Sequence, residues 1–388
     1  MMPESLLLIK LTRIAVTGNP EPLLLDVNWE AFLQLAQSHK LSALAYDGLK
    51  KSGENLSPVP ENILTVLHST CMQAIARSVQ MDGLRCRLEA GLQQRKVAHI
   101  FLKGAVLKYD YPVSALRTLS DMDILVHTED YPAIDELARA LGGVPEDGDG
   151  NHHSFIFPGR LHVEFHPNLL HHDTPIGAQI NPGWQYARES ESFSKELTEE
   201  GLYLNTLCHM AHHMADGGIG IRFVLDVWVH RHLRKQAIDR AFVEQELARF
   251  GLLEFTKNIE ALAEHWFSGS ESAPFPAGLD EYIVTSGSHG TAQRAALNAV
   301  SMSAGGSRRS AMMGKAFYSR AEMEDRFPWV KGKPWLLPAA WCIRAFRVVT
   351  RRSHLLKDWV STTGAVSDQE AAAQRELLNS FGICRQKK

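Results

Sequence analysis

The 388-residue sequence has few cysteines, and their spacing fits neither a disulfide framework nor a cysteine metal site. There are five, an odd number, without any Cys-x-x-Cys pair: Cys71, Cys86, Cys208, Cys342 and Cys384. Secreted domains that depend on disulfides carry dense, even sets of cysteines. We therefore expect reduced thiols and a cytoplasmic protein.

Long hydrophobic runs are also missing. No stretch reaches the roughly 18 uninterrupted apolar residues of a transmembrane helix. The first residues, "MMPESLLLIKLTRIAV", carry Glu4 early, and their apolar run is too short for a signal peptide. Internal repeats and low-complexity runs are absent as well. The composition is that of a globular chain long enough for two or three domains.

Positive and negative charges nearly balance over the whole chain, but they are unevenly distributed along it. The formal net charge is -3, yet residues 303–388 hold 16 Lys and Arg against 7 Asp and Glu. This excess predicts an anionic partner for the C-terminal segment, although a solvated basic face explains it equally well. The run "WLLPAAWCIRAFRVVTRR" suits a peripheral membrane contact, but Pro338 interrupts it and favours packing against the body. No nucleic-acid-binding motif is recognisable.

Hydrophobic periodicity changes along the chain and predicts an α+β fold. Residues 1–96 are mainly helical, residues 97–170 alternate short apolar runs with turns, and residues 171–302 are helical again. Pro158-Gly159 joins two strand-like runs and predicts a hairpin. We expect a small mixed-sheet core at 97–170, flanked by helical regions and followed by a basic helical segment at 303–388.

The stretch "RTLSDMDILV" places two acids at the start of an apolar strand. Side chains alternate along a strand, so Asp121 and Asp123 point the same way. Two carboxylates side by side are unfavourable unless a cation or a proton lies between them. Asp is also common in turns before strands, so this pair alone does not identify a site.

Two further elements strengthen a functional interpretation. Gly104 follows the first strand at a turn into a helix, where backbone N–H groups can approach anionic oxygens, and Lys103 lies beside it. In "LHVEFH", alternation sends His162, Glu164 and His166 to one face. Glu164 on a strand next to the Asp pair would complete a three-acid cluster suited to Mg²⁺.

On these residues the sequence resembles an uncharacterised bacterial nucleotidyltransferase-like family within the DNA polymerase beta-type superfamily. The similarity is sharpest in "FLKGAVLKYDYPVSALRTLSDMDILV" and "VEFHPNL", and also covers "LAQSHKLSALAYDGL" and "LCHMAHHMADGGIGIRFVLDVWV". It implies that Asp121, Asp123 and Glu164 bind Mg²⁺ or Mn²⁺ and carry catalysis. It further implies that the nucleotide contacts come from a second set of residues: Lys103, Gly104, Arg117, Ser120 and His166.

The last similar segment implies a helical His-x-x-x-His element followed by an acid, namely His209, His213 and Asp226. Two histidines four apart share a helix face and can bind zinc. The segment lacks the Glu that follows the first His in zinc proteases, so lining of the nucleotide pocket or a structural role is favoured.

Two functions remain open. The first is a metal-dependent nucleotidyltransferase that moves a nucleoside monophosphate from a nucleoside triphosphate such as ATP to an unknown acceptor hydroxyl, releasing pyrophosphate. The second is an inactive nucleotide-binding regulatory or scaffold protein. It stays open because Gly104 is followed by Ala105, where the wider superfamily has a Ser or Gly.

Overall fold

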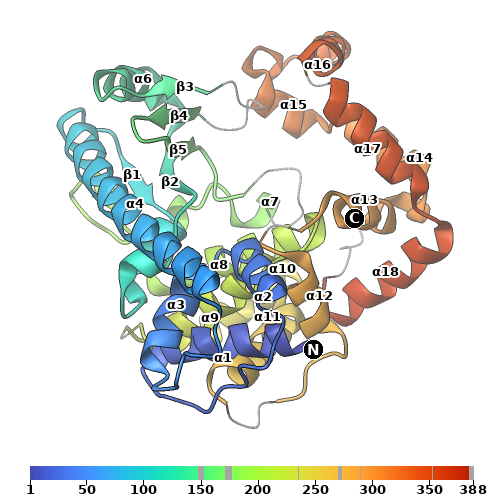
Figure 1. Cartoon of the computed structure of the whole chain (residues 1–388). Coiled ribbons are helices and arrows are strands. Elements are labelled where there is room, and N and C mark those ends of the chain that lie inside the picture. Colours follow the sequence, from blue (N-terminus) through green and yellow to red (C-terminus); the bar gives the residue numbers. More distant parts are fainter. Residues whose placement is uncertain are drawn as a thin grey trace.

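A six-stranded mixed sheet is the only sheet in the computed structural model, which describes residues 1–146, 153–170, 177–234, 236–269, 273–288, 290–351 and 353–383. The strand order is β3-β4-β5-β2-β1-β6. The strands are β1 His99–Phe101, β2 Asp121–Val126, β3 Val144–Pro145, β4 His153–Phe157, β5 Leu161–His166 and β6 Ser194–Lys195. The sheet lies at the upper end of the molecule in Figure 1, with most of the helices below it. The α+β prediction is confirmed.

The described helices fall on both sides of the sheet in sequence. Before and within it are α1 Pro3–Thr17, α2 Trp29–Ser38, α3 Ser42–Lys51, α4 Glu61–Gln94, α5 Gly104–Leu107, α6 Tyr131–Ala140 and α7 Gly177–Ile180. After it come α8 Glu199–Asp216, α9 Ile221–His232, α10 Arg240–Phe250, α11 Leu253–Phe267, α12 Leu279–Ser286 and α13 Ala292–Met302. The C-terminal set is α14 Arg308–Ala316, α15 Arg320–Arg326, α16 Leu337–Arg351, α17 Ser353–Ala365 and α18 Asp368–Ser380.

Strand β2 is buried on both faces, which explains its continuous apolar run. Met122, Ile124 and Val126 join a core with α4 and α6. Leu125 instead joins the larger core, which lies mainly among helices α1–α3 and α8–α12, the helical body. The odd-numbered side chains, including those of Asp121 and Asp123, therefore face the helical body. The acids lie at the junction between the two cores.

Strand β5 alternates as predicted. Leu161, Val163 and Phe165 are buried, and the residues between them are half-buried. It pairs antiparallel with β4 through the predicted hairpin and parallel with β2. The parallel register sets Asp123 directly opposite Glu164. Adjacent strands lie about 4.8 Å apart, so this register brings the two carboxylates close together.

The C-terminal segment ends against the helical body. Helix α18 begins with a capping box at Ser367 and Glu370, and its Gln374 donates a hydrogen bond to Asn298 of α13 at 2.7 Å. Phe381 beyond it is fully buried in the larger core. An anionic partner for this segment stays a prediction, as do the domain boundaries. The sheet itself extends past residue 170, because β6 joins it at 194–195.

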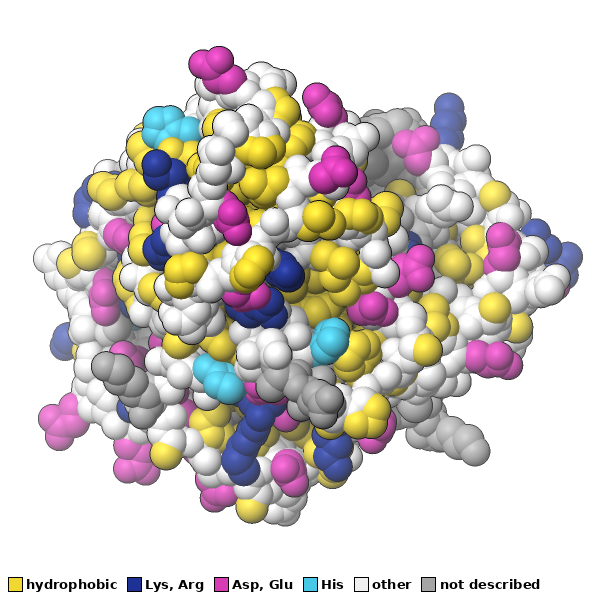
Figure 2. Space-filling model, turned by 60° about the horizontal axis from the view of Figure 1, so that its bottom comes forward, with side chains coloured by type: hydrophobic (Ala, Val, Ile, Leu, Met, Phe, Trp, Pro, Cys, Tyr) yellow, Lys and Arg dark blue, Asp and Glu magenta, His cyan; other side chains and the backbone are white. Residues whose placement is uncertain are grey.

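No helix among the described residues is both long enough and apolar enough to cross a membrane. Figure 2 shows acidic and basic side chains interspersed with hydrophobic ones over the face in view.

Candidate metal and nucleotide site

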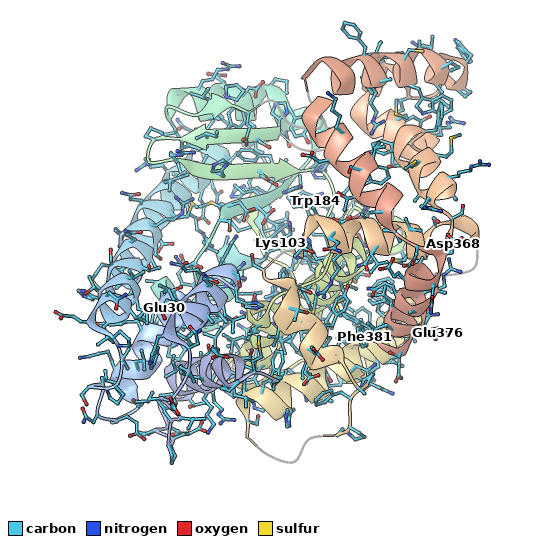
Figure 3. All side chains as sticks on the ribbon, turned by 45° about the vertical axis from the view of Figure 1, so that its right-hand side comes forward. Glu30, Lys103, Trp184, Asp368, Glu376 and Phe381 are labelled. Carbon is cyan, nitrogen blue, oxygen red and sulfur yellow. The ribbon has the colours of Figure 1, made fainter. Side chains whose placement is uncertain are left out.

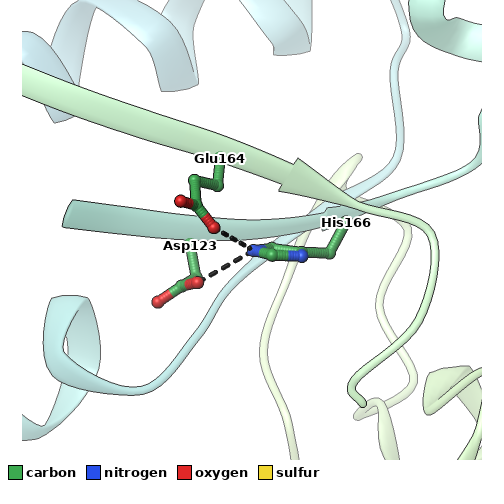
Figure 4. A group of neighbouring side chains, drawn as sticks. All are labelled: Asp123, Glu164 and His166. Atoms are coloured by element: carbon green, nitrogen blue, oxygen red, sulfur yellow. Dashed lines mark hydrogen bonds and ion pairs between the residues drawn. The ribbon is translucent and has the colours of Figure 1, made fainter. Parts of the chain in front are cut away.

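Three side chains from the two central parallel strands converge on one point. Asp123 of β2 and Glu164 and His166 of β5 each offer a ligand atom, and these atoms all lie within 4.8 Å of one another. His166 Nε2 lies 2.8 Å from an Asp123 oxygen and 3.2 Å from a Glu164 oxygen (Figure 4). It is the only such group of three among the residues that the structure describes.

Lys103 and His166 both contact the buried Asp123 carboxylate. Lys103 Nζ donates a hydrogen bond to it at 2.9 Å, beside the contact from His166. Burial alone would raise the pKa of Asp123, but Lys103 and His166 outweigh it and hold that pKa well below its usual range. Burial likewise opposes the charge on His166, yet its hydrogen bonds to Asp123 and Glu164 leave its pKa raised. Lys103 and His166 thus favour the charged form of the Asp123 carboxylate.

Lys103 reaches Asp123 from a strained backbone. Its φ is 50° and its ψ is -125°, a region that residues other than glycine rarely adopt. The turn is closed by the Ala105 N–H, which donates to the Leu102 carbonyl at 3.1 Å. Such strain costs about 1–3 kcal/mol and persists where the surrounding structure enforces it. Figure 3 shows Lys103 where the sheet meets the helical body.

Asp121 does not belong to the converging group. It stands opposite His162 in the register, one side-chain position further toward the start of β2 than Asp123. Burial, followed by repulsion from Asp123, raises the pKa of Asp121, and the positive charges of Lys103 and Lys40 counteract this in part. The ligand set brought together is therefore Asp123, Glu164 and His166, whereas the sequence predicted Asp121, Asp123 and Glu164 and assigned His166 to the nucleotide. The shared face of Glu164 and His166 was the signal for the histidine.

Arg117 lies in a buried ion pair rather than at an open phosphate position. Its Nε and Nη2 donate to the two oxygens of Asp226 at 3.0 and 2.7 Å, and the Tyr111 hydroxyl donates to the same carboxylate at 2.7 Å. Both charged side chains are less than a tenth exposed. Asp226 thus occupies the Nε–Nη2 edge of the guanidinium, and the predicted triphosphate contact of Arg117 stays a prediction.

Gly104 is required by the packing of Arg117. A Cβ atom at this position would lie 2.3 Å from Arg117 Nη1 and 2.5 Å from Leu119 Cδ2. The missing side chain therefore makes room for the guanidinium and links the strained turn at Lys103 to the Arg117–Asp226 pair. A contact between the Gly104 backbone and a phosphate stays a prediction.

Asp226 is accordingly not grouped with the two histidines named beside it in the sequence. His209 and His213 contact each other on α8 through Nε2 atoms 3.0 Å apart, and Phe223 packs near both rings. One imidazole must donate and the other accept in this contact. No zinc-type set of three ligands includes them within the described residues.

Ser120 is held by a cation that sequence reasoning missed. Lys40, in the turn after α2, donates from Nζ to Ser120 Oγ at 2.6 Å. Arg222, in the first turn of α9, donates from Nη1 to the Thr118 carbonyl at 3.0 Å. Both lie far in sequence from the acids, and no local pattern marks either of them.

The donor set suits a hard or borderline divalent cation. Carboxylate oxygens are the ligands that Mg²⁺ prefers, and Mn²⁺ accepts carboxylate and imidazole together. Asp123 and Glu164 supply the oxygens, and His166 supplies the nitrogen. The residues present therefore fit Mg²⁺ through the carboxylates and fit Mn²⁺ through all three.

Comparison with known proteins identifies a family. A family described as an uncharacterised nucleotidyltransferase matches residues 26–268, more than half of the chain. No curated protein and no solved structure matches. The matched span contains the whole sheet, the converging side chains of Asp123, Glu164 and His166, and helices α8 and α9. The chain belongs to this uncharacterised nucleotidyltransferase family.

Proposed function

We propose that the protein is a metal-dependent nucleotidyltransferase that moves a nucleoside monophosphate from a nucleoside triphosphate to an acceptor hydroxyl. The observation that carries this proposal is the convergence of Asp123, Glu164 and His166 within 4.8 Å on two parallel strands. Membership of the family supports the reaction class. Two carboxylates beside a half-buried lysine form the kind of site that binds a metal–triphosphate complex.

Asp123 and Glu164 would hold the divalent ion, with His166 as a further ligand or as a contact to the substrate. The bound ion would neutralise charge on the phosphate oxygens. The acceptor oxygen forms a bond to the α-phosphorus while the bond from that phosphorus to the bridging oxygen breaks, and pyrophosphate leaves. Glu164, the half-buried acid of the group, would accept the proton of the acceptor hydroxyl. Asp121 lies next to the group and would add negative charge for a second ion.

The alternative is a protein that binds nucleotide without transferring it. Ala105 after Gly104 supports this alternative, because the turn lacks a side-chain hydroxyl for the phosphates. Pyrophosphate release separates the two functions, since only transfer produces it.

The experiment incubates the full chain with each γ-labelled nucleoside triphosphate, Mg²⁺ or Mn²⁺, and a mixture of hydroxyl acceptors, and measures labelled pyrophosphate. We expect release by the wild-type protein and a loss of at least a hundredfold in Asp123→Asn and Glu164→Gln. The matched control is Glu146→Gln, since Glu146 is a more exposed carboxylate near His162 of the same sheet. Equal release by all four proteins would refute the assignment, and binding without release would favour the alternative.

A further inference from the structure

The segment Thr118–Leu119–Ser120, which leads into β2 and Asp121, is surrounded by basic side chains from three helical regions. Arg222 of α9 binds the Thr118 carbonyl, Lys40 binds the Ser120 hydroxyl, and Arg77 of α4 binds the carbonyls of Leu119 and Ser120 at 3.2 and 3.1 Å. The hydrogen bonds of these three cations distinguish those that only support the loop from those that keep donors for a ligand.

The guanidinium of Arg77 already uses most of its hydrogen-bond donors to support the loop. Its Nε, Nη1 and Nη2 all donate, to the carbonyls of Leu119, Ser120 and Arg160. Four contacts from its three nitrogens thus reach three backbone oxygens. Arg77 holds the loop and has little capacity left for a ligand.

Arg222 uses fewer of its guanidinium nitrogens as donors than Arg77 does. Only Nη1 donates within the described residues, to the Thr118 carbonyl at 3.0 Å and at the limit of 3.5 Å to the Thr118 hydroxyl. The side chain is 7% exposed, and it forms no ion pair with a described carboxylate. Burial, followed by the nearby charge of Arg117, lowers the pKa of Arg222 to about 10. A buried guanidinium with unused donors and cationic neighbours is the expected environment for an incoming anion.

Lys40 is fixed near the same segment. The Thr118 hydroxyl donates to the Lys40 carbonyl at 3.4 Å, while the Lys40 ammonium donates to Ser120. Because Ser120 accepts from Lys40, its own O–H is left to donate to a different acceptor. The positive charge of Lys40 also acts to lower the pKa of Asp121.

His39 connects the two cations through the backbone. Its Nδ1 accepts the Ile221 N–H at 3.1 Å, and its Nε2 lies 2.9 Å from the Val284 carbonyl, so Nε2 carries the proton. This fully buried imidazole joins the residue before Lys40 to the residue before Arg222. The relative placement of Lys40 and Arg222 is therefore set by a rigid contact.

We propose that Arg222 and Lys40, with the Ser120 hydroxyl, form an anion subsite that binds the pyrophosphate portion of the nucleoside triphosphate beside Asp121. The proposal rests on the proposed function for the identity of the nucleotide, but the anion binding is independent of transfer. Two cations and a hydroxyl match an anion with several phosphoryl oxygens better than a single carboxylate. The position also separates roles, because Asp123 and Glu164 lie further along the strands, where the α-phosphate would react.

The test is calorimetric titration of inorganic pyrophosphate, tripolyphosphate and orthophosphate into the full chain in EDTA, so that no metal contributes. We expect pyrophosphate and tripolyphosphate to bind more tightly than orthophosphate. Arg222→Gln and Lys40→Gln should each weaken pyrophosphate binding about tenfold, equivalent to about 1.4 kcal/mol. Arg77→Gln, the matched control on the same loop, should change it by less than about twofold.

Two outcomes would overturn the subsite: unchanged pyrophosphate affinity in both Arg222→Gln and Lys40→Gln, or an equal loss in Arg77→Gln, which would indicate loosening of the loop. If Arg222→Gln does not fold, Lys40→Gln and Arg222→Lys decide, with the lysine variant expected to retain most of the affinity. Asp123→Asn separates the two proposals. It should abolish transfer without weakening metal-free pyrophosphate binding. A wild-type protein that binds pyrophosphate through Arg222 but transfers nothing would refute the function and support the subsite.

Discussion

Replacing Asp226 by asparagine would leave the Arg117 guanidinium buried without its ionic partner. The exposed fractions of Arg117 and Asp226 are 8% and 4%, and two hydrogen bonds of 3.0 and 2.7 Å join them. Removing one partner of a buried pair costs about 3–5 kcal/mol, mainly because the remaining charge stays desolvated. Asparagine retains an oxygen for Tyr111, so we expect a loss near the lower end, about 3 kcal/mol in the free energy of unfolding.

Equilibrium unfolding in urea measures this loss. The double variant Arg117→Met/Asp226→Leu removes both charges, so its destabilisation should be well below the sum of the two single losses. The control is Glu324→Gln, which breaks an exposed pair with Arg320 on α15 and should change stability by no more than about 0.5 kcal/mol. A destabilisation below about 1 kcal/mol in Asp226→Asn would refute the view that this pair holds the turn around Gly104.

Two further predictions concern stability. His39 is held neutral, because burial lowers its pKa to about 4, whereas the unfolded chain binds a proton below about 6.5. On acidification the unfolded state therefore binds a proton at His39 before the folded state does. The free energy of unfolding should fall by about 2 kcal/mol between pH 7 and pH 5 through this group. Urea unfolding of His39→Gln at both pH values should lack this fall. Gly104→Ala should cost about 1–3 kcal/mol because its Cβ would collide with Arg117 and Leu119, whereas Gly314→Ala on α14, where nothing lies within 4 Å, should be neutral or slightly stabilising. Equal thermal midpoints for the two alanine variants would contradict the packing role of Gly104.

Local patterns in the sequence predicted the sheet and part of the site. The hairpin at Pro158-Gly159 and the alternation around Glu164 are both present in β4 and β5. Alternation depends only on neighbouring residues, so it can be recognised without tertiary information. The resemblance to the nucleotidyltransferase-like family then identified Asp123 and Glu164 as members of one cluster, and the parallel register sets them opposite each other.

The remaining features depend on contacts between distant segments. Arg117 and Asp226 are 109 residues apart, and Lys40 and Ser120 are 80 apart. Nothing in a local pattern shows that Arg117 pairs with a buried acid, so the sequence predicts a phosphate contact for this residue. Asp121 lies outside the group and His166 lies within it because of how far each side chain lies along the paired strands. Spacing in the sequence alone does not fix this.

The central claim is that Asp123, Glu164 and His166 bind a divalent cation as one unit. Its most direct test is titration of the protein with Mn²⁺, followed by electron paramagnetic resonance of the free ion. We predict a site in the wild-type protein and in Glu146→Gln, with at least tenfold weaker binding in Asp123→Asn and in Glu164→Gln. Wild-type affinity for Mn²⁺ in both of these variants would contradict the assignment of the metal site.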